Sequence, residues 1–419
     1  MRGSVLDSGG IRRRVGTLCS TLALAALAVP AAASGDPIYV APEDESSGFF
    51  CSQSQPCGIA VGINLAAGDD DEVLLAPGSY ETSAELEVPN GSTNVTIRPR
   101  DAGTRPVIVS TASPALQLSG AGATVEGIDI SHDSPGGTGL FGLASSQINN
   151  VVSISNGDTP CQMANGRMTD TICIATGTSG RAMRVSLTGG SATTTIRNAT
   201  LFATGNNGTG IYASATDSDA SVSLDVASTI AVGDGFDVET ETGSGGSVDV
   251  DLAASNFETR AVDAGATVTA PTNADNQTEE PIFVGFGLEQ SPDSPTVDAG
   301  LVDDQTGDTD VYGDARPQGF GNDIGADELP DTVAPTTKVK KKPKRRTRST
   351  RAKFVFVSNE PGAGFECKLD KGGYEKCSSP LKLKKLKPRR HRLSVRAVDT
   401  AGNVDATPAK HRWTVKPKN

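Results

Sequence analysis

Few side chains in this sequence combine types and spacing that could support acid–base chemistry. His132 lies between Ser131 and Asp133 and could act as a general base, because the pKa of histidine lies near neutral pH. The chain has only two other histidines, His391 and His411, and none is spaced from a cysteine pair as a structural zinc site requires. A single histidine in a short strand is more often a surface or turn residue, so His132 alone assigns no activity.

Six cysteines follow Cys19 and fall into three close pairs, with separations of 6, 12 and 10 positions. The pairs are Cys51 with Cys57, Cys161 with Cys173, and Cys367 with Cys377. Many connectivities are open, but pairing each cysteine with its neighbour requires the fewest assumptions because the pairs lie far apart in the sequence. We therefore predict three local disulfides and an oxidising compartment.

Positive charge is concentrated near the C-terminus. Residues 331–419 contain 25 Lys and Arg against 7 Asp and Glu, whereas residues 35–330 contain no lysine and only nine arginines. The densest basic run contains Lys340, Lys341, Lys342, Lys344, Arg345 and Arg346. A second basic group follows it: Lys382, Lys384, Lys385, Lys387, Arg389, Arg390 and Arg392. This run predicts anionic partners such as cell-wall polymers, extracellular DNA or the acidic part of the chain itself.

No aromatic residue interleaves with the basic run, so base stacking and specific nucleic-acid readout are not expected. Any nucleic-acid binding would be directed to the phosphate backbone and would weaken with salt. The alternative interpretation of the run is a solvated spacer.

Residues 1–33 are predicted to be a secretory signal peptide. Three arginines at positions 12–14 precede an apolar stretch at 15–29, and the alanines at 31–33 would allow cleavage. The stretch is shorter than the ~20 apolar residues of a membrane helix, and no other segment is long enough to span a membrane. The sequence therefore predicts a secreted or cell-surface protein without a membrane span.

Short alternations of apolar and polar residues fill the acidic region 34–330, and this period of two is typical of half-buried strands. Strands beginning at Val125, Ile148, Ile172, Ile196, Leu224 and Val250 recur after 23, 24, 24, 28 and 26 residues. Residues 196–205 also echo residues 224–233. Such a repeat is typical of a solenoid, because one coil cannot bury its inward aliphatic side chains until others stack on it. We predict a right-handed parallel β-helix.

Both ends of this region resemble secreted pectate-lyase-like β-helix proteins. Residues 38–80, with Ile38-Tyr39-Val40-Ala41, Cys51, Cys57 and Pro77-Gly78-Ser79-Tyr80, are similar to the opening segment of that family. Residues 295–329, with Gly313-Asp314-Ala315-Arg316-Pro317 and Asp323-Ile324-Gly325-Ala326-Asp327, resemble the closing segment that follows β-helices in many secreted bacterial surface proteins.

Residues 331–352 are interpreted as a basic linker, and residues 353–419 as a small β-sandwich. The sandwich is similar to bacterial immunoglobulin-like or fibronectin-like modules in the pattern Phe365-x-Cys367-x-Leu369-Asp370, Cys377-x-x-Pro380 and Leu393-x-Val395-Arg396-Ala397-x-Asp399-x-Ala401-Gly402-Asn403. This resemblance implies that the matched residues are architectural. The predicted fold class is therefore all-β, a β-helix solenoid followed by a small sandwich.

The β-helix resemblance also implies that polysaccharide lyases and hydrolases must be considered. A lyase needs an arginine or lysine base beside carboxylates that hold calcium. The candidates are Arg181, Arg184 and Arg197 as base and Asp129 and Asp133 as ligands, with His132 nearby. None of these residues matches a catalytic motif of the family.

The loop Asp303–Asp310 could bind calcium through hard oxygen ligands, but its spacing is not that of an EF-hand, and a solvated acidic turn is the simpler interpretation. We predict a non-catalytic β-helix protein that adheres to anionic polymers through its basic C-terminal region, without an assigned cofactor or metal. Calcium and glycan binding stay open. A secreted carbohydrate-active enzyme is the alternative.

Overall fold

The structure is a computed structural model that describes residues 37–43, 45, 51–271, 275–284, 288–318, 321–360 and 362–417. The predicted signal peptide, residues 1–33, lies outside the described residues. In the described part of the chain, no helix is long and apolar enough to cross a membrane.

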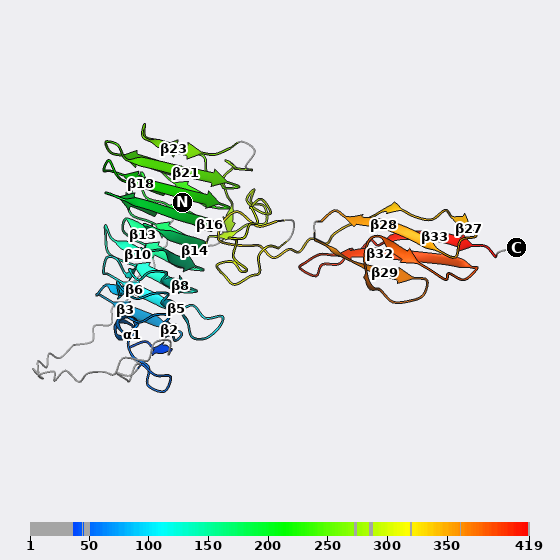
Figure 1. Cartoon of the computed structure of the whole chain (residues 1–419), viewed down its shortest axis with the longest axis horizontal. Coiled ribbons are helices and arrows are strands. Elements are labelled where there is room, and N and C mark those ends of the chain that lie inside the picture. The colour runs from blue at the N-terminus through cyan, green and yellow to red at the C-terminus, as the bar shows by residue number, and fades with distance from the viewer. Residues whose placement is uncertain are drawn as a thin grey trace, which may run out of the picture. The chain divides into compact units, whose positions relative to one another are not determined.

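Stacked parallel strands form the first part of the chain, as Figure 1 shows, with one short helix, α1 (Ile59–Leu65), near its beginning. The larger sheet contains 15 strands: β1 (Ile38–Val40), β2 (Glu72–Leu75), β3 (Ser79–Thr82), β5 (Thr96–Pro99), β6 (Val107–Ser110), β8 (Thr124–Glu126), β9 (Asp129–His132), β11 (Ser146–Asn149), β12 (Val152–Ser155), β14 (Gly166–Ala175), β16 (Ser191–Ala203), β18 (Ser221–Ala227), β19 (Ile230–Gly233), β21 (Ser247–Ala253) and β23 (Ala266–Thr269). The second sheet contains eight strands: β4 (Leu86–Val88), β7 (Leu116–Leu118), β10 (Thr138–Gly142), β13 (Thr159–Met163), β15 (Arg181–Leu187), β17 (Thr209–Ala215), β20 (Phe236–Thr242) and β22 (Arg260–Ala261). This is the predicted parallel β-helix.

Aliphatic ladders fill the interior of the β-helix. One of them contains Val125, Ile148, Met168 and Ile196, which are fully buried and lie in register on neighbouring strands. The sequence interpretation was wrong to place Ile172 in this column, because Ile172 pairs with Val152 and Thr200 instead. The mistake has a physical cause. β14 bends at a corner of the coil and carries aliphatic residues both before and after that corner, and spacing along the sequence does not show which of them belongs to the column.

The predicted echo between residues 196–205 and 224–233 is also displaced by two residues. Ile196 pairs with Val226 rather than with Leu224, and Thr200 pairs with Ile230. Because alternate residues share a face, a displacement of two keeps the inward side chains inward. The coils therefore vary in length without losing their core.

Sharp corners recur in successive coils at residues with left-handed backbone. Asn150, Asp170, Asn198 and Ser228 have φ angles of 53°, 49°, 48° and 50°. Asparagine and aspartate tolerate this region because their short polar side chains bond locally. Here Asn198 donates a hydrogen bond to Asp170 on the neighbouring coil, at 3.3 Å, so the corners also stabilise one another.

The closing segment packs along the side of the coils. A short hairpin of β24 (Phe283–Val284) and β25 (Glu289–Gln290) precedes it. Leu288, Val311 and Ala326 form a second apolar cluster with Ile172. The backbone N–H of Ala326 donates to Thr200 Oγ1 at 3.0 Å. The outward face of β14 is thereby covered.

The C-terminal strands form two antiparallel-rich sheets that fit a small sandwich. One sheet contains β26 (Thr337–Lys341), β28 (Ala352–Ser358) and β31 (Leu381–Leu383), and the other contains β27 (Arg346–Thr347), β33 (Ala409–Val415), β32 (Arg390–Val398), β29 (Gly364–Leu369) and β30 (Glu375–Cys377). Between them lies a core that includes Phe354, Phe356, Leu393, Val395 and Trp413.

Part of the segment predicted to be a linker, residues 331–352, is a strand of this sandwich. β26 pairs antiparallel with β28, and Val339 on β26 packs against the core. Lysines alternate with Thr337 and Val339 along this edge strand, so the two-residue period of a strand is present. The many charged residues made the segment resemble a solvated linker instead.

All three disulfides have the predicted pairing: Cys51 with Cys57, Cys161 with Cys173, and Cys367 with Cys377. Cys161 on β13 and Cys173 on β14 join the two sheets of the β-helix through its interior. Cys367 and Cys377 join β29 to β30 in the sandwich.

Candidate polyanion-binding groove

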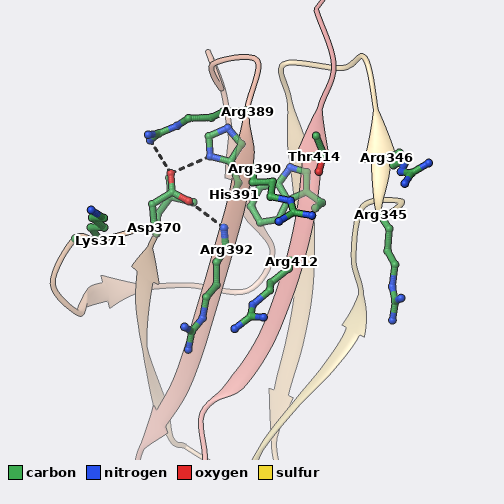
Figure 2. A pocket seen from close by; sticks show the side chains of 13 residues that line it. Arg345, Arg346, Asp370, Lys371, Arg389, Arg390, His391, Arg392, Arg412 and Thr414 are labelled. Atoms are coloured by element: carbon green, nitrogen blue, oxygen red, sulfur yellow. Dashed lines mark hydrogen bonds and ion pairs between the residues drawn. The ribbon is translucent and has the colours of Figure 1, made fainter.

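A groove on the sandwich is lined by cationic side chains from segments that are distant in the sequence (Figure 2). Seven cationic side chains line it: Arg345, Arg346, Lys371, Arg389, Arg390, Arg392 and Arg412. The remaining lining residues are Leu369, Asp370, Gly372, His391, Trp413 and Thr414. Asp370 is the one carboxylate among these described lining residues.

Strand alternation places four of these cations on one face of the sheet, namely Arg346, Arg390, Arg392 and Arg412. Arg390 lies opposite Thr414, and Thr414 lies opposite Arg346 on the far side. Two residues further along, Arg392 lies directly opposite Arg412. The residues between them, His391 and Trp413, face the core, because successive side chains of a strand point to opposite faces.

Asp370 organises one wall of the groove. It follows β29 with a φ of 58°, and its carboxylate accepts the backbone N–H of Arg392 at 2.9 Å. The same carboxylate lies 2.8 Å from Arg389 Nη2 and 2.9 Å from His391 Nδ1. Burial alone would raise the pKa of Asp370, but the hydrogen bonds from Arg392 and His391 and the charge of Arg389 lower it overall.

His391 is held beside this wall by contacts of both its ring nitrogens. Its Nδ1 faces Asp370 Oδ2 and its Nε2 faces the Lys387 carbonyl oxygen, each at 2.9 Å. The ring therefore links Asp370 to the turn that precedes β32.

The groove is chemically suited to oxyanions. Arginine offers planar paired N–H donors that match phosphate, sulfate and carboxylate groups. The Nε of Arg392 is buried and has no hydrogen-bond partner within the described residues. The cationic side chains of the groove therefore outnumber the carboxylates that could pair with them among the described lining residues.

The predicted basic run divides between two places. Arg345 and Arg346 line the groove, whereas Lys340, Lys341, Lys342 and Lys344 are exposed on or just after β26 and do not line it. Arg412 and Lys371 were not predicted. The alternation His411-Arg412-Trp413-Thr414-Val415 is a signal that could have placed Arg412 on the outer face of a strand.

The candidates for a lyase site do not converge. Asp129 and His132 lie on β9 but on opposite faces, because Asp129 pairs with Arg105 at 2.7 Å outside while His132 is fully buried. Asp133 accepts a hydrogen bond from Asn156 on the exposed side. The expectation that His132 is a surface or turn residue is therefore wrong.

His132 fits inside because of the residues beside it. Its Nδ1 lies 3.2 Å from Ser155 Oγ, and a Cβ atom added to Gly137 would lie 2.2 Å from its Cε1. Burial lowers the pKa of His132. The imidazole is thus a neutral interior side chain beside a glycine that makes room for it.

Arg197 is committed to structural ion pairs. Its side chain is 6% exposed and lies 2.7 Å from Asp225 and 2.9 Å from Asp303. Burial would lower its pKa, but the hydrogen bonds to these two carboxylates raise it overall, which is the opposite of what a base requires. Arg181 stacks over the Tyr212 ring at 3.8 Å, and Arg184 donates to Ser186, both on the other sheet's strand β15.

The acidic loop Asp303–Asp310 also serves the closing segment. Asp303 pairs with Arg197, and the buried Asp310 accepts backbone N–H groups from Tyr312, Asp314 and Glu328. These carboxylates therefore hold turns, as the simpler interpretation of the loop expects.

Comparisons with known proteins add little to the assignment. No protein-family model matches the chain, and no curated protein matches it. Among solved structures, the chain is similar to the crystal structure of pectate lyase Pel9A, with 13% identity and a TM-score of 0.33, over 71% of this chain and 97% of that chain. The groove on the sandwich is thus the site to which the geometry itself points.

Proposed function

We propose that the chain is a secreted or cell-surface β-helix protein that binds anionic polymers in the groove of its C-terminal sandwich. One observation carries the proposal: among the described residues that line the groove, seven are cations and only Asp370 is a carboxylate. The candidates weighed for catalysis are separated or already paired, so we propose binding rather than turnover.

A polymer suits the groove better than a single small anion. The cations lie on β27, β32 and β33, directly before β27 and β32, and in the turn after β29, so their charges are spread along the sheet. Residues 34–330 contain nine arginines against 42 acidic residues, so the acidic β-helix repels a polyanion. Binding is therefore expected at the sandwich alone.

The test uses the full chain with two probes, a labelled DNA duplex of about 20 base pairs and a poly(glycerol phosphate). If three to six cations engage the DNA, the slope of log K against log salt is about −3 to −5. In the double variant Arg392→Gln/Arg412→Gln, the slope of log K against log salt should become less negative by about 2. Its affinity for DNA at low salt should fall at least about tenfold.

The matched control is Lys353→Gln/Lys382→Gln, which removes two opposed charges from the other sheet. It should retain most of the affinity. Binding that does not respond to salt, or an equal loss of affinity in the control, would refute a specific role of the groove. Buried Trp413 reports whether each variant is folded, since it is the only tryptophan of the chain.

A further inference from the structure

Three carboxylates gather at the end of the sandwich where β28 and β32 finish. Asp331 precedes β26, Glu360 follows β28, and Asp399 follows β32. Their chain segments meet because β26 runs antiparallel to β28, with Thr337 opposite Ser358, and because Thr337 Oγ1 accepts the backbone N–H of Ala397 at 2.8 Å. One carboxylate oxygen from each of the three lies within 4.8 Å of the others.

All three residues of the cluster have carboxylate oxygens without a hydrogen-bond partner within the described residues. Glu360 is 5% exposed, and neither of its carboxylate oxygens has a hydrogen-bond partner. Asp331 Oδ2 and Asp399 Oδ2 are likewise buried and unpartnered. Leaving even one buried carboxylate without a counter-charge or donor is strongly unfavourable.

The other oxygens of the two aspartates are fixed by backbone groups. Asp331 Oδ1 accepts the N–H of Val333 at 2.8 Å, and Asp399 Oδ1 accepts the N–H of Asn403 at 2.7 Å. Each aspartate therefore holds one oxygen on its own loop and leaves the second buried without a partner. This is the arrangement of a prepared ligand set, with orientation supplied before any ion arrives.

The cluster lacks a basic partner. None of the ion pairs found among the described residues includes Asp331, Glu360 or Asp399. A bound cation would supply the counter-charge that the unpartnered oxygens lack.

We propose that Asp331, Glu360 and Asp399 form a calcium site. The ligands are all carboxylate oxygens, which hard cations prefer, and calcium accepts irregular sets of six to eight oxygens at about 2.3–2.6 Å. Ligands of one such ion lie at most about 5 Å apart, and the three oxygens of this cluster lie within 4.8 Å of one another. Water completes the coordination, and the ion ties the segment before β26 to the loops after β28 and β32.

The test is calcium titration of the full chain by calorimetry after removal of metal with a chelator, with magnesium titrated in parallel. Calcium should also raise the unfolding midpoint reported by Trp413, which lies in the core of the same sandwich. Glu360→Gln and Asp399→Asn should each weaken the affinity at least about tenfold and abolish the shift of the midpoint.

The matched control is Glu375→Gln, an exposed acidic residue on β30 that should leave the titration unchanged. The second variant, Asp399→Asn, keeps the test valid if Glu360→Gln does not fold. Calcium binding that survives in both variants would place the ion elsewhere and overturn the proposal. No calcium-dependent shift in the unaltered chain, or a stronger response to magnesium, would overturn it too.

Discussion

Arg392 on β32 lies directly opposite Arg412 on β33. Like charges in directly opposed positions of an antiparallel pair destabilise a sheet. Five other cations line the same groove, and Asp370, the one carboxylate among the described lining residues, accepts the backbone N–H of Arg392 and pairs with Arg389. The groove therefore maintains charge repulsion that an anionic ligand would relieve.

Replacing Arg412 with threonine should separate stability from binding. Arg412→Thr removes the repulsion with Arg392 and introduces a residue that favours strands, so the free energy of unfolding should rise by about 0.3–1 kcal/mol. The affinity for DNA at low salt should fall several-fold. Denaturant unfolding followed by Trp413 fluorescence and anisotropy of the labelled duplex measure the two effects.

Lys382→Thr is the matched control, because Lys382 lies directly opposite Lys353 on the other sheet. It should gain similar stability and keep its affinity. A loss of stability in Arg412→Thr would contradict the view that repulsion between Arg392 and Arg412 destabilises the sandwich.

The carboxylate of Asp370 should make the sandwich sensitive to acid. Its pKa is lowered in the folded chain, so its contribution is present above the unfolded value of about 4 and is lost as the pH falls through the folded pKa. Asp370→Asn should destabilise the sandwich by about 1–2 kcal/mol at pH 7 and by progressively less as the pH falls below about 4. Urea unfolding at several pH values measures the difference, and parallel curves for the two proteins would refute this role.

The closing segment should give the β-helix the opposite pH dependence. Burial raises the pKa of Glu328 to about 7 and that of Asp170 to about 6, although Arg316 lies against both carboxylates and lowers each value in part. Their folded pKa values exceed the unfolded ones, so the folded state binds more protons between about pH 4 and pH 7. Stability should therefore rise as the pH falls from 7.5 to 5, as measured by the far-UV circular dichroism transition.

Glu328→Gln should reduce this difference between pH 5 and pH 7.5, because the amide does not titrate. The exposed Glu258→Gln serves as its control and should keep the full difference. A β-helix transition that is less stable at pH 5 than at pH 7.5 would show that the buried carboxylates do not control it.

Ile172 and Ile154 should differ sharply in importance although both lie on neighbouring strands of the same sheet. Ile172 is fully buried under the closing segment, whereas Ile154 is 38% exposed. Ile172→Ala should cost about 2–4 kcal/mol of unfolding free energy, and Ile154→Ala less than about 1 kcal/mol. Equal effects would mean that the closing segment does not pack against β14 in solution.

Local features determined what the sequence alone could establish. The close spacing of Cys161 and Cys173 predicted their disulfide, and alternating apolar residues in successive segments predicted a parallel solenoid. Regular spacing was insufficient for register, because Met168 and Ile172 on β14 have the same apolar character but lie on opposite sides of a corner at Asp170.

Tertiary structure alone decided which charges share a site. Arg346, Arg392 and Arg412 meet because three strands pair, and Asp331, Glu360 and Asp399 meet because three segment ends coincide. A sequence gives the number and spacing of charged residues along the chain. It does not give the pairing of distant strands, and charges interact through space, so the groove and the carboxylate cluster exist only once the sheets have formed.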